Sequence, residues 1–110
     1  MADKLDVKQG TLALMILRTL DVLGPLHGYG VARRIEETSK NRLTLNYGTL
    51  YPALVKLEQE GFIKAEWRQS ENNRRAKYYE LTRKGRDELD AQTAAWRKLA
   101  ATVGQVLETA

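Results

Sequence analysis

Four basic side chains lie close together in the second half of the chain, at a spacing that suits the binding of phosphate groups. Residues 68–77 hold one acid, Glu71, and four basic residues: Arg68, Arg74, Arg75 and Lys77. Guanidinium and ammonium groups bind phosphate oxygens through charge-assisted hydrogen bonds. The net charge of the whole chain is only +4, so the positive charge is concentrated here. A solvated charged turn, which is common in proteins, is the plain alternative to a phosphate-binding site.

These basic residues are expected to lie on a β-hairpin. Two segments with aromatic and apolar residues, 62–68 and 77–83, flank the polar stretch 69–76, as two strands flank a turn. Asn72 and Asn73 suit that turn because asparagine tolerates left-handed backbone angles. The candidate phosphate-binding residues then lie at or just after the tip of the hairpin. They would contact the backbone of a nucleic acid or enter its minor groove, and they are Asn73, Arg74, Arg75 and Lys77.

A helix is predicted directly before the hairpin, at residues 47–59. Leu50, Leu54 and Leu57 form its buried stripe at positions i, i+4 and i+7, and Asn46 is a suitable N-cap. Arginine and glutamine are absent from its first turns, so base contacts would depend on tyrosine, threonine and DNA shape. The face opposite the stripe is free to enter a major groove, or simply to pack at the domain surface, and it carries Tyr47, Thr49, Tyr51 and Lys56.

Three more helices are predicted, at residues 8–23, 29–38 and 83–108. Residues 27–30 form a tight connection into the second of these, and Thr82 is a suitable cap for the last. Three helices followed by a two-stranded hairpin make a winged helix-turn-helix fold, so the chain is predicted to be mainly α-helical. The apolar face of the first helix is made of Leu12, Met15, Ile16, Thr19, Leu20 and Leu23.

The last predicted helix carries an apolar stripe that the three-helix body and hairpin do not need. Its members recur at steps of seven and three residues, as in a short coiled coil: Leu89, Trp96, Leu99, Val103 and Val106. Water contact with an unpartnered tryptophan is costly, so we expect these residues to pair with a second copy of the chain. Packing of the helix onto its own domain is the alternative, and Trp96 is also a candidate wall for a flat aromatic ligand.

These expectations divide the chain into two parts, a winged-helix domain at residues 1–82 and a C-terminal dimerisation helix at residues 83–110. The composition excludes several other classes of protein. The chain has no cysteine and one histidine, His27, so it lacks the residues for a disulfide, a cysteine zinc site, a thiol nucleophile or a metal-sharing histidine pair. No apolar run approaches the roughly 18 residues of a membrane-spanning helix, and the N-terminus lacks the apolar core of a signal peptide. We therefore expect a cytoplasmic protein that is not an enzyme and uses no metal or cofactor.

Four blocks of the sequence are more specific than the pattern of helices and strands. They are HGYG at 27–30, GTLYPAL at 48–54, LEQEGFI at 57–63, and RRAKYYELT at 74–82 with Gly85 following. Together they resemble the PadR family of bacterial transcriptional regulators, and the resemblance covers residues 8–107 or so. The chain is similar to the short members of that family, which have a single C-terminal helix.

The resemblance implies a dimeric winged-helix protein, in most members a repressor. The third helix of the family enters the major groove, and the hairpin contacts the backbone or minor groove. The C-terminal helix dimerises with help from the N-terminal helix, and Trp96 stands where a tryptophan is frequent. Some members lose DNA affinity when phenolic acids or flat aromatic drugs bind at the dimer interface. By position, the recognition residues of this chain are Asn46, Gly48, Thr49, Tyr51 and Lys56.

The leading hypothesis is therefore a dimeric repressor that binds double-stranded DNA at a near-palindromic operator and is released by a small aromatic effector. The alternative is a winged-helix module that binds a protein partner or a small aromatic ligand without DNA, since a fold does not fix a function. Salt separates the two hypotheses, because DNA affinity falls steeply as the salt concentration rises.

Overall fold

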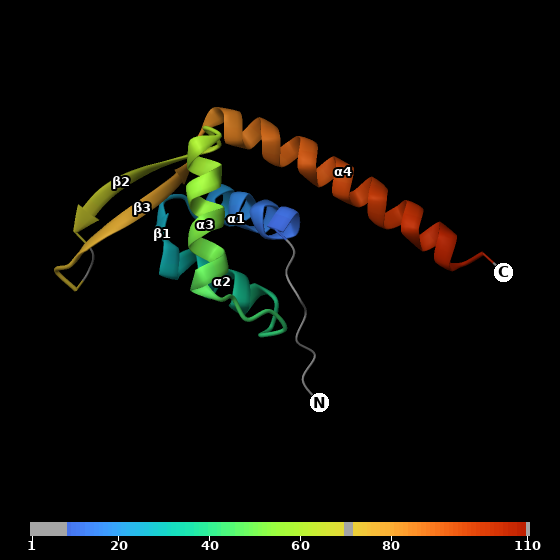
Figure 1. Cartoon of the computed structure of the whole chain (residues 1–110), viewed down its shortest axis with the longest axis horizontal. Helices are drawn as coiled ribbons and strands as arrows, with labels where there is room; N and C mark the ends of the chain where they lie inside the picture. The colour runs from blue at the N-terminus through green and yellow to red at the C-terminus, as the bar shows by residue number, and fades with distance from the viewer. Residues whose placement is uncertain (1–8, 70–71, 110) are drawn as a thin grey trace.

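A computed structural model describes residues 9–69 and 72–109 of the chain. The predictions for residues 1–8 and for Glu71 lie outside the described residues. The fold is mainly helical with a small antiparallel sheet (Figure 1), which is the winged-helix arrangement that the sequence predicts. In chain order its elements are α1 (Gln9–Leu23), β1 (Leu26–His27), α2 (Gly28–Thr38), α3 (Tyr47–Gln59), β2 (Ile63–Gln69), β3 (Arg75–Leu81) and α4 (Arg83–Leu107).

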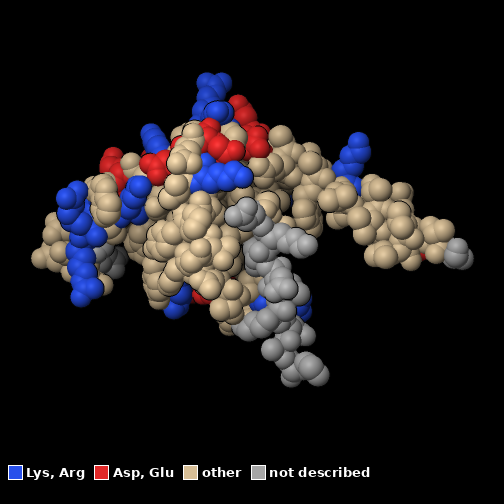
Figure 2. Space-filling view, viewed as in Figure 1, with Lys and Arg blue, Asp and Glu red and all other residues tan. Residues whose placement is uncertain are grey.

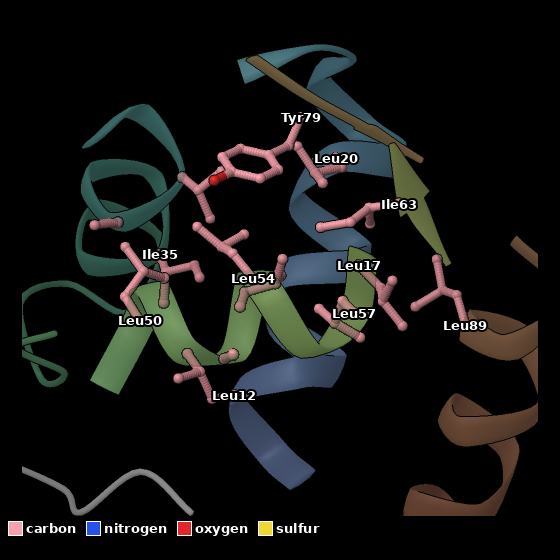
Figure 3. Packing of buried hydrophobic residues seen from close by; sticks show 14 residues of the cluster. Leu12, Leu17, Leu20, Ile35, Leu50, Leu54, Leu57, Ile63, Tyr79 and Leu89 are labelled. Carbon is pink, nitrogen blue, oxygen red and sulfur yellow. The ribbon is translucent and has the colours of Figure 1, made fainter. Parts of the chain in front are cut away.

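The hydrophobic core lies between α1, α2, α3 and the sheet. Leu12, Ile16 and Leu20 of α1 are buried at steps of four residues, so one face of this helix is covered along most of its length. Figure 3 shows α1 beside the buried stripe of α3. The predicted bounds of α3 and its stripe are both confirmed, and the stripe consists of Leu50, Leu54 and Leu57.

The predicted apolar face of α1 is correct only in part. Met15 is half-buried and Leu23 is 43% exposed, whereas Leu17 is fully buried. Leu23 ends α1, and the chain turns away at Gly24, whose φ is +78°. Leu17 belongs to the same buried cluster as Leu89 of α4 (Figure 3), and the periodicity of α1 alone does not reveal this contact.

The sheet has three strands in the order β1, β3, β2. β2 and β3 pair from Ile63 opposite Leu81 to Gln69 opposite Arg75, which confirms the predicted hairpin. We call β2, β3 and their turn the wing. Asn73 in this turn has the expected left-handed backbone, with a φ of 63°. The sequence does not predict β1, because a strand of two residues is too short to display alternation.

Polar side chains cap the starts of α2 and α3. Asn46 Oδ1 accepts a hydrogen bond from the backbone N of Gly48 at 2.6 Å, so the predicted cap of α3 is confirmed. His27 Nδ1 accepts one from the backbone N of Gly30 at 2.9 Å. His27 is therefore a capping residue of α2, a more definite role than the sequence indicates for a histidine between glycines.

The base of the wing joins α4 at a close contact. Thr82 Oγ1 caps α4 by accepting from the backbone N of Gly85 at 3.0 Å, and it donates to the carbonyl oxygen of Gly61 at 2.7 Å. A Cβ atom on Gly85 would lie 1.9 Å from the carbonyl oxygen of Phe62. Only glycine fits at position 85, so the start of α4 is fixed against the start of β2.

Beyond this contact, α4 extends away from the other elements (Figure 1). Its first turns are held to α1 by the buried side chain of Leu89 and by an ion pair between Arg86 and Asp21. The residues of α4 after Thr93 are exposed, except for a half-buried Gly104. Within residues 9–69 and 72–109, no helix has the length and apolar character needed to cross a membrane.

Candidate nucleic-acid interface

The start of α3 forms an exposed surface from residues that the sequence predicts. The buried stripe of α3 begins only at Leu50, so the first turn projects from the body of the fold. The rings of Tyr47 and Tyr51 lie next to each other, with centroids 5.8 Å apart. A helix start that projects in this way has the geometry to enter a major groove. The exposed residues of this first turn and its cap are Asn46, Tyr47, Gly48 and Thr49.

Tyr51 both packs against the body of the fold and remains accessible. A Cβ atom on Gly28, the first residue of α2, would lie 2.9 Å from the hydroxyl oxygen of Tyr51, so the phenol ring rests directly on the backbone of α2. The side chain is nevertheless 43% exposed. The contact fixes the ring of Tyr51 between α3 and α2, and its remaining surface faces solvent.

Lys56 lies apart from the other predicted recognition residues. It is five residues after Tyr51, which turns it by roughly 140° around the helix axis. Lys56 lines a groove with Ala13 of α1 and Glu88 of α4, whereas Tyr51 lines a cleft with the wing. The structure therefore brings the first turn of α3 and Tyr51 together, and it does not bring Lys56 to the same surface.

The two arginines predicted to bind phosphate, Arg74 and Arg75, are exposed, and one of them is held in place by an aromatic ring. The guanidinium of Arg75 lies over the ring of Trp67, 5.5 Å from its centroid, which is a cation–π contact. In the part of the turn that the structure describes, no aromatic ring restrains Arg74 in the same way. Figure 2 shows Lys and Arg side chains gathered at the end of the molecule that carries the wing.

The other two predicted wing residues are engaged within the fold. Lys77 Nζ donates to Glu58 Oε1 of α3 at 3.2 Å, and its side chain is 34% exposed. This ion pair ties the wing to α3. Asn73 Oδ1 accepts a hydrogen bond from Gln69 Nε2 at 2.5 Å, which closes the turn. Arg74 and Arg75 are therefore more available to bind an anionic ligand than Lys77, whose charge is already paired with Glu58.

Two residues of α2 that the sequence reasoning did not select lie beside this surface. Tyr29 is 52% exposed, and its hydroxyl oxygen accepts a hydrogen bond from Arg33 at 3.3 Å. Arg33 also pairs with Glu37 at 3.3 Å. Tyr29 lines the same cleft as Tyr51 and the wing. An exposed aromatic residue in the first turn of a helix, within the HGYG block, is the signal that could have identified it.

Desolvation raises the pKa of Tyr47 above its ordinary value of 10.0, and the nearby Tyr29 and Tyr51 act in the same direction. The phenol of Tyr47 therefore keeps its proton throughout the physiological pH range. A protonated hydroxyl donates a hydrogen bond to a base edge or phosphate oxygen, and it adds no negative charge to the surface.

The exposed half of α4 carries four of the five residues predicted to form a dimer interface. Leu89 differs from these four, because it is 3% exposed and packs in the core of its own chain. It has almost no surface left for a second copy, since the first turns of α4 lie against α1. The other four are 46–67% exposed: Trp96, Leu99, Val103 and Val106.

Trp96 lines a groove of about 550 Å³ between α1 and α4. Leu14 and Met15 of α1 form its apolar side, and Arg18 and Asp90 add charged groups. The groove is large enough for a small ring compound. No group of three or more side chains able to ligate a metal lies together in the described part of the chain.

Comparison with known sequences gives one family match. The sequence model of the "Transcriptional regulator PadR-like family" matches residues 16–91, which run from α1 into α4. A curated relative, an uncharacterised 37.1 kDa protein in transposon TN4556 of Streptomyces fradiae, is 36% identical over 87 residues. That alignment covers 79% of this chain but only 23% of the relative, so the chain spans about a quarter of its length.

Comparison with solved structures gives the same fold. A PadR family transcriptional regulator from Eggerthella lenta is 30% identical, with a TM-score of 0.80 over 93% of this chain and 86% of that chain. A PadR family transcription regulator from Clostridium difficile is 32% identical, with a TM-score of 0.75 over 87% of this chain and 97% of that chain. Both alignments cover most of each protein.

Proposed function

The chain belongs to the PadR-like family of transcriptional regulators, and from this premise we propose that it is a dimeric repressor of a near-palindromic operator in double-stranded DNA. The observation that carries the proposal is the exposed surface on which the start of α3 and the wing present Thr49, Arg74 and Arg75. A regulator of bacterial transcription works where the DNA is, so the proposed location is the cytoplasm.

The two parts of this surface have different proposed roles. The first turn of α3, with Tyr47, Thr49 and Tyr51, reads base edges in the major groove. Arg74 and Arg75 of the wing bind phosphates and set affinity more than sequence choice. Residues 1–82 then act as the DNA-binding domain, and residues 83–110 act as the dimerisation helix.

Dimerisation through α4 is proposed from the apolar stripe on its exposed half. Trp96, Leu99 and Val103 have between 46% and 62% of their surface exposed, and this half of α4 extends beyond the rest of its own chain. Contact between such an apolar stripe and water is unfavourable, and packing against a second copy in a symmetric dimer removes the stripe from water. Two copies then present two α3 helices to two half-sites about one turn of DNA apart.

The most direct test of the wing contacts is the salt dependence of DNA binding. We expect the Arg74→Ala, Arg75→Ala double variant to bind duplex DNA more weakly. Its plot of log affinity against log salt should be flatter by about two, since each lost phosphate contact removes roughly 0.9 from the slope. Fluorescence anisotropy of a labelled duplex over a salt series measures both quantities.

The matched control for this test is Lys64→Ala. Lys64 lies on β2 and pairs with Glu80 at 3.9 Å, and it is not among the residues that line the cleft with Arg74 and Arg75. Its removal should leave the slope nearly unchanged. An unchanged slope in the double variant would show that the wing does not touch phosphate. A wild-type protein whose binding is insensitive to salt would favour the alternative module that binds protein or ligand without DNA.

A small flat aromatic effector is proposed for the groove beside Trp96. The chain has two tryptophans, Trp67 and Trp96, so each single substitution to phenylalanine leaves one reporter. Titration of aromatic compounds should change the emission of the Trp67→Phe variant and leave the Trp96→Phe variant unaffected. An equal response from the Trp96→Phe variant would remove Trp96 from the effector site.

A further inference from the structure

A groove of about 350 Å³ between α1, α2 and the segment after α2 has no role in the proposed function. We call it the α1–α2 groove. It differs from the groove beside Trp96, although Met15 and Arg18 of α1 border both. Its volume suits one small molecule. The apolar part of its lining comes from three parts of the chain: Met15 and Val22 of α1, Ile35 of α2, and Leu43.

The apolar walls of this groove are aliphatic. Among the residues that the structure describes, no aromatic ring lines it. Ile35 is 4% exposed and lies among the core side chains in Figure 3, so it belongs to the floor of the groove, whereas the exposed Val22 belongs to its rim. A flat ring has no aromatic partner to stack on here. A flexible alkyl chain, in contrast, can follow a surface of aliphatic side chains.

Two of the three hydroxyl groups that line the groove are hydrogen-bonded to nearby backbone. Thr19 Oγ1 donates to the carbonyl oxygen of Met15 at 2.8 Å. Ser39 Oγ donates to the carbonyl oxygen of Glu36 at 2.9 Å and accepts from the backbone N of Leu43 at 3.1 Å. The third hydroxyl, that of Thr38, belongs to an exposed residue. An alkyl chain can therefore cover the inner part of the groove without depriving a polar group of its partner.

The charged side chains that line the groove are both arginines, and no Asp or Glu lines it in the described part of the chain. Arg34 is exposed and forms no ion pair with any described residue. Arg18 pairs with Asp21 at 2.8 Å, but Asp21 also pairs with Arg86. One carboxylate is thus shared by two guanidinium groups, and the groove keeps an excess of positive charge. A ligand with an anionic group complements this charge.

We propose that the α1–α2 groove binds a free medium-chain fatty acid. Arg34 and Arg18 bind its carboxylate, and its alkyl chain lies on the aliphatic side chains of Met15, Ile35 and Leu43. The volume suits one alkyl chain, so a phospholipid with two chains does not fit. This inference goes beyond the proposed function, because the site requires neither DNA nor a second copy of the chain.

The test follows the methyl group of Met15 by NMR. The chain has two methionines, so labelling with ¹³C-methyl methionine gives a simple spectrum, and a Met15→Leu variant identifies the signal of Met15. Titration with sodium decanoate should shift this signal in a saturable way. Across hexanoate, octanoate and decanoate, affinity should rise roughly threefold to fourfold for each added methylene, because each methylene leaves water.

Variants and a neutral ligand separate the two parts of the site. Arg34→Gln should weaken decanoate binding about tenfold, because it removes a charge-assisted contact. The same variant should leave the binding of 1-decanol, which has the same chain and no charge, nearly unchanged. Val22→Asp should weaken the binding of decanoate more than that of 1-decanol, since the new charge repels a carboxylate.

The matched control is Arg33→Gln. Arg33 precedes Arg34 on α2, but it pairs with Glu37 at 3.3 Å and does not line the groove. Its replacement should leave decanoate binding at the wild-type level. Thermal unfolding of each variant confirms that it is folded.

Three outcomes would overturn the proposal. Equal affinity for decanoate and 1-decanol, or an equal loss in Arg33→Gln and Arg34→Gln, would exclude a carboxylate site. Binding to vesicles of anionic phospholipid, without any shift of Met15 by free decanoate, would assign the surface to a membrane. Loss of a dimer at saturating decanoate, measured by sedimentation equilibrium, would assign the groove to a second copy. None of these outcomes bears on the proposed binding of DNA.

Discussion

Gly85 shows how one residue fixes two parts of the molecule against each other. A Cβ atom at position 85 would lie only 1.9 Å from the carbonyl oxygen of Phe62. The start of α4 therefore approaches the start of β2 more closely than any residue other than glycine at position 85 permits. Thr82 adds hydrogen bonds to both sides of the same contact. The wing and the exposed helix therefore share a rigid base.

We expect Gly85→Ala to destabilise the fold by about 2–4 kcal/mol, because the obstacle is a backbone atom that cannot rotate away. Thermal or urea unfolding measures the loss. Gly10→Ala is the matched control: it also replaces a helical glycine, but among the described residues no atom beyond its chain neighbours and its own helix backbone lies within 4 Å of the added Cβ. That variant should be unchanged or slightly more stable. Equal stability of the two variants would contradict the close contact at Gly85.

At the scale of the elements, sequence reasoning succeeded where the determinants are local. The bounds of α3 follow from the Asn46 cap and from a leucine stripe, both of which a short window contains. The hairpin follows from its aromatic strands and from Asn73, which adopts the expected left-handed backbone. These features were predictable because each depends on neighbours within one or two turns.

Sequence reasoning was incomplete where partners are distant in the chain. β1 pairs with β3 from far along the chain, with Leu26 opposite Tyr79, and a strand of two residues displays no periodicity. The ion pair of Lys77 with Glu58 crosses from the wing to α3. The sequence predicts the apolar stripe of α4. Its periodicity does not distinguish a residue that is buried in the core of the same chain, such as Leu89, from one that is exposed to solvent.

The exposed half of α4 gives a prediction about assembly. We expect Val103→Asp to dissociate the proposed dimer, because it places a charge within the apolar stripe. Sedimentation equilibrium measures the change in mass. Gln105→Asp introduces the same charge two residues away, outside the stripe, and should leave the dimer intact. A monomeric wild-type protein, or equal dissociation by both variants, would contradict dimerisation through this face.

At the scale of the whole molecule, the proposed function joins a DNA-facing end to a helix that binds a second copy. The wing projects at one end, α3 stands in the body beside it, and the exposed half of α4 extends from the other end (Figure 1). The Gly85 contact connects them, so the geometry of a dimer fixes the spacing of two DNA-reading surfaces. Sequence-specific DNA binding then depends on the dimer, because both half-sites of the operator must be bound at the same time.

The central claim is that this chain binds DNA with sequence preference. It is tested most directly by a gel shift with DNA from upstream of its own gene, at two salt concentrations, against an excess of random competitor. We predict a discrete complex that survives the competitor and weakens as salt rises, while the complex with random DNA is lost first. Failure to form a complex with any duplex at low salt would contradict the claim.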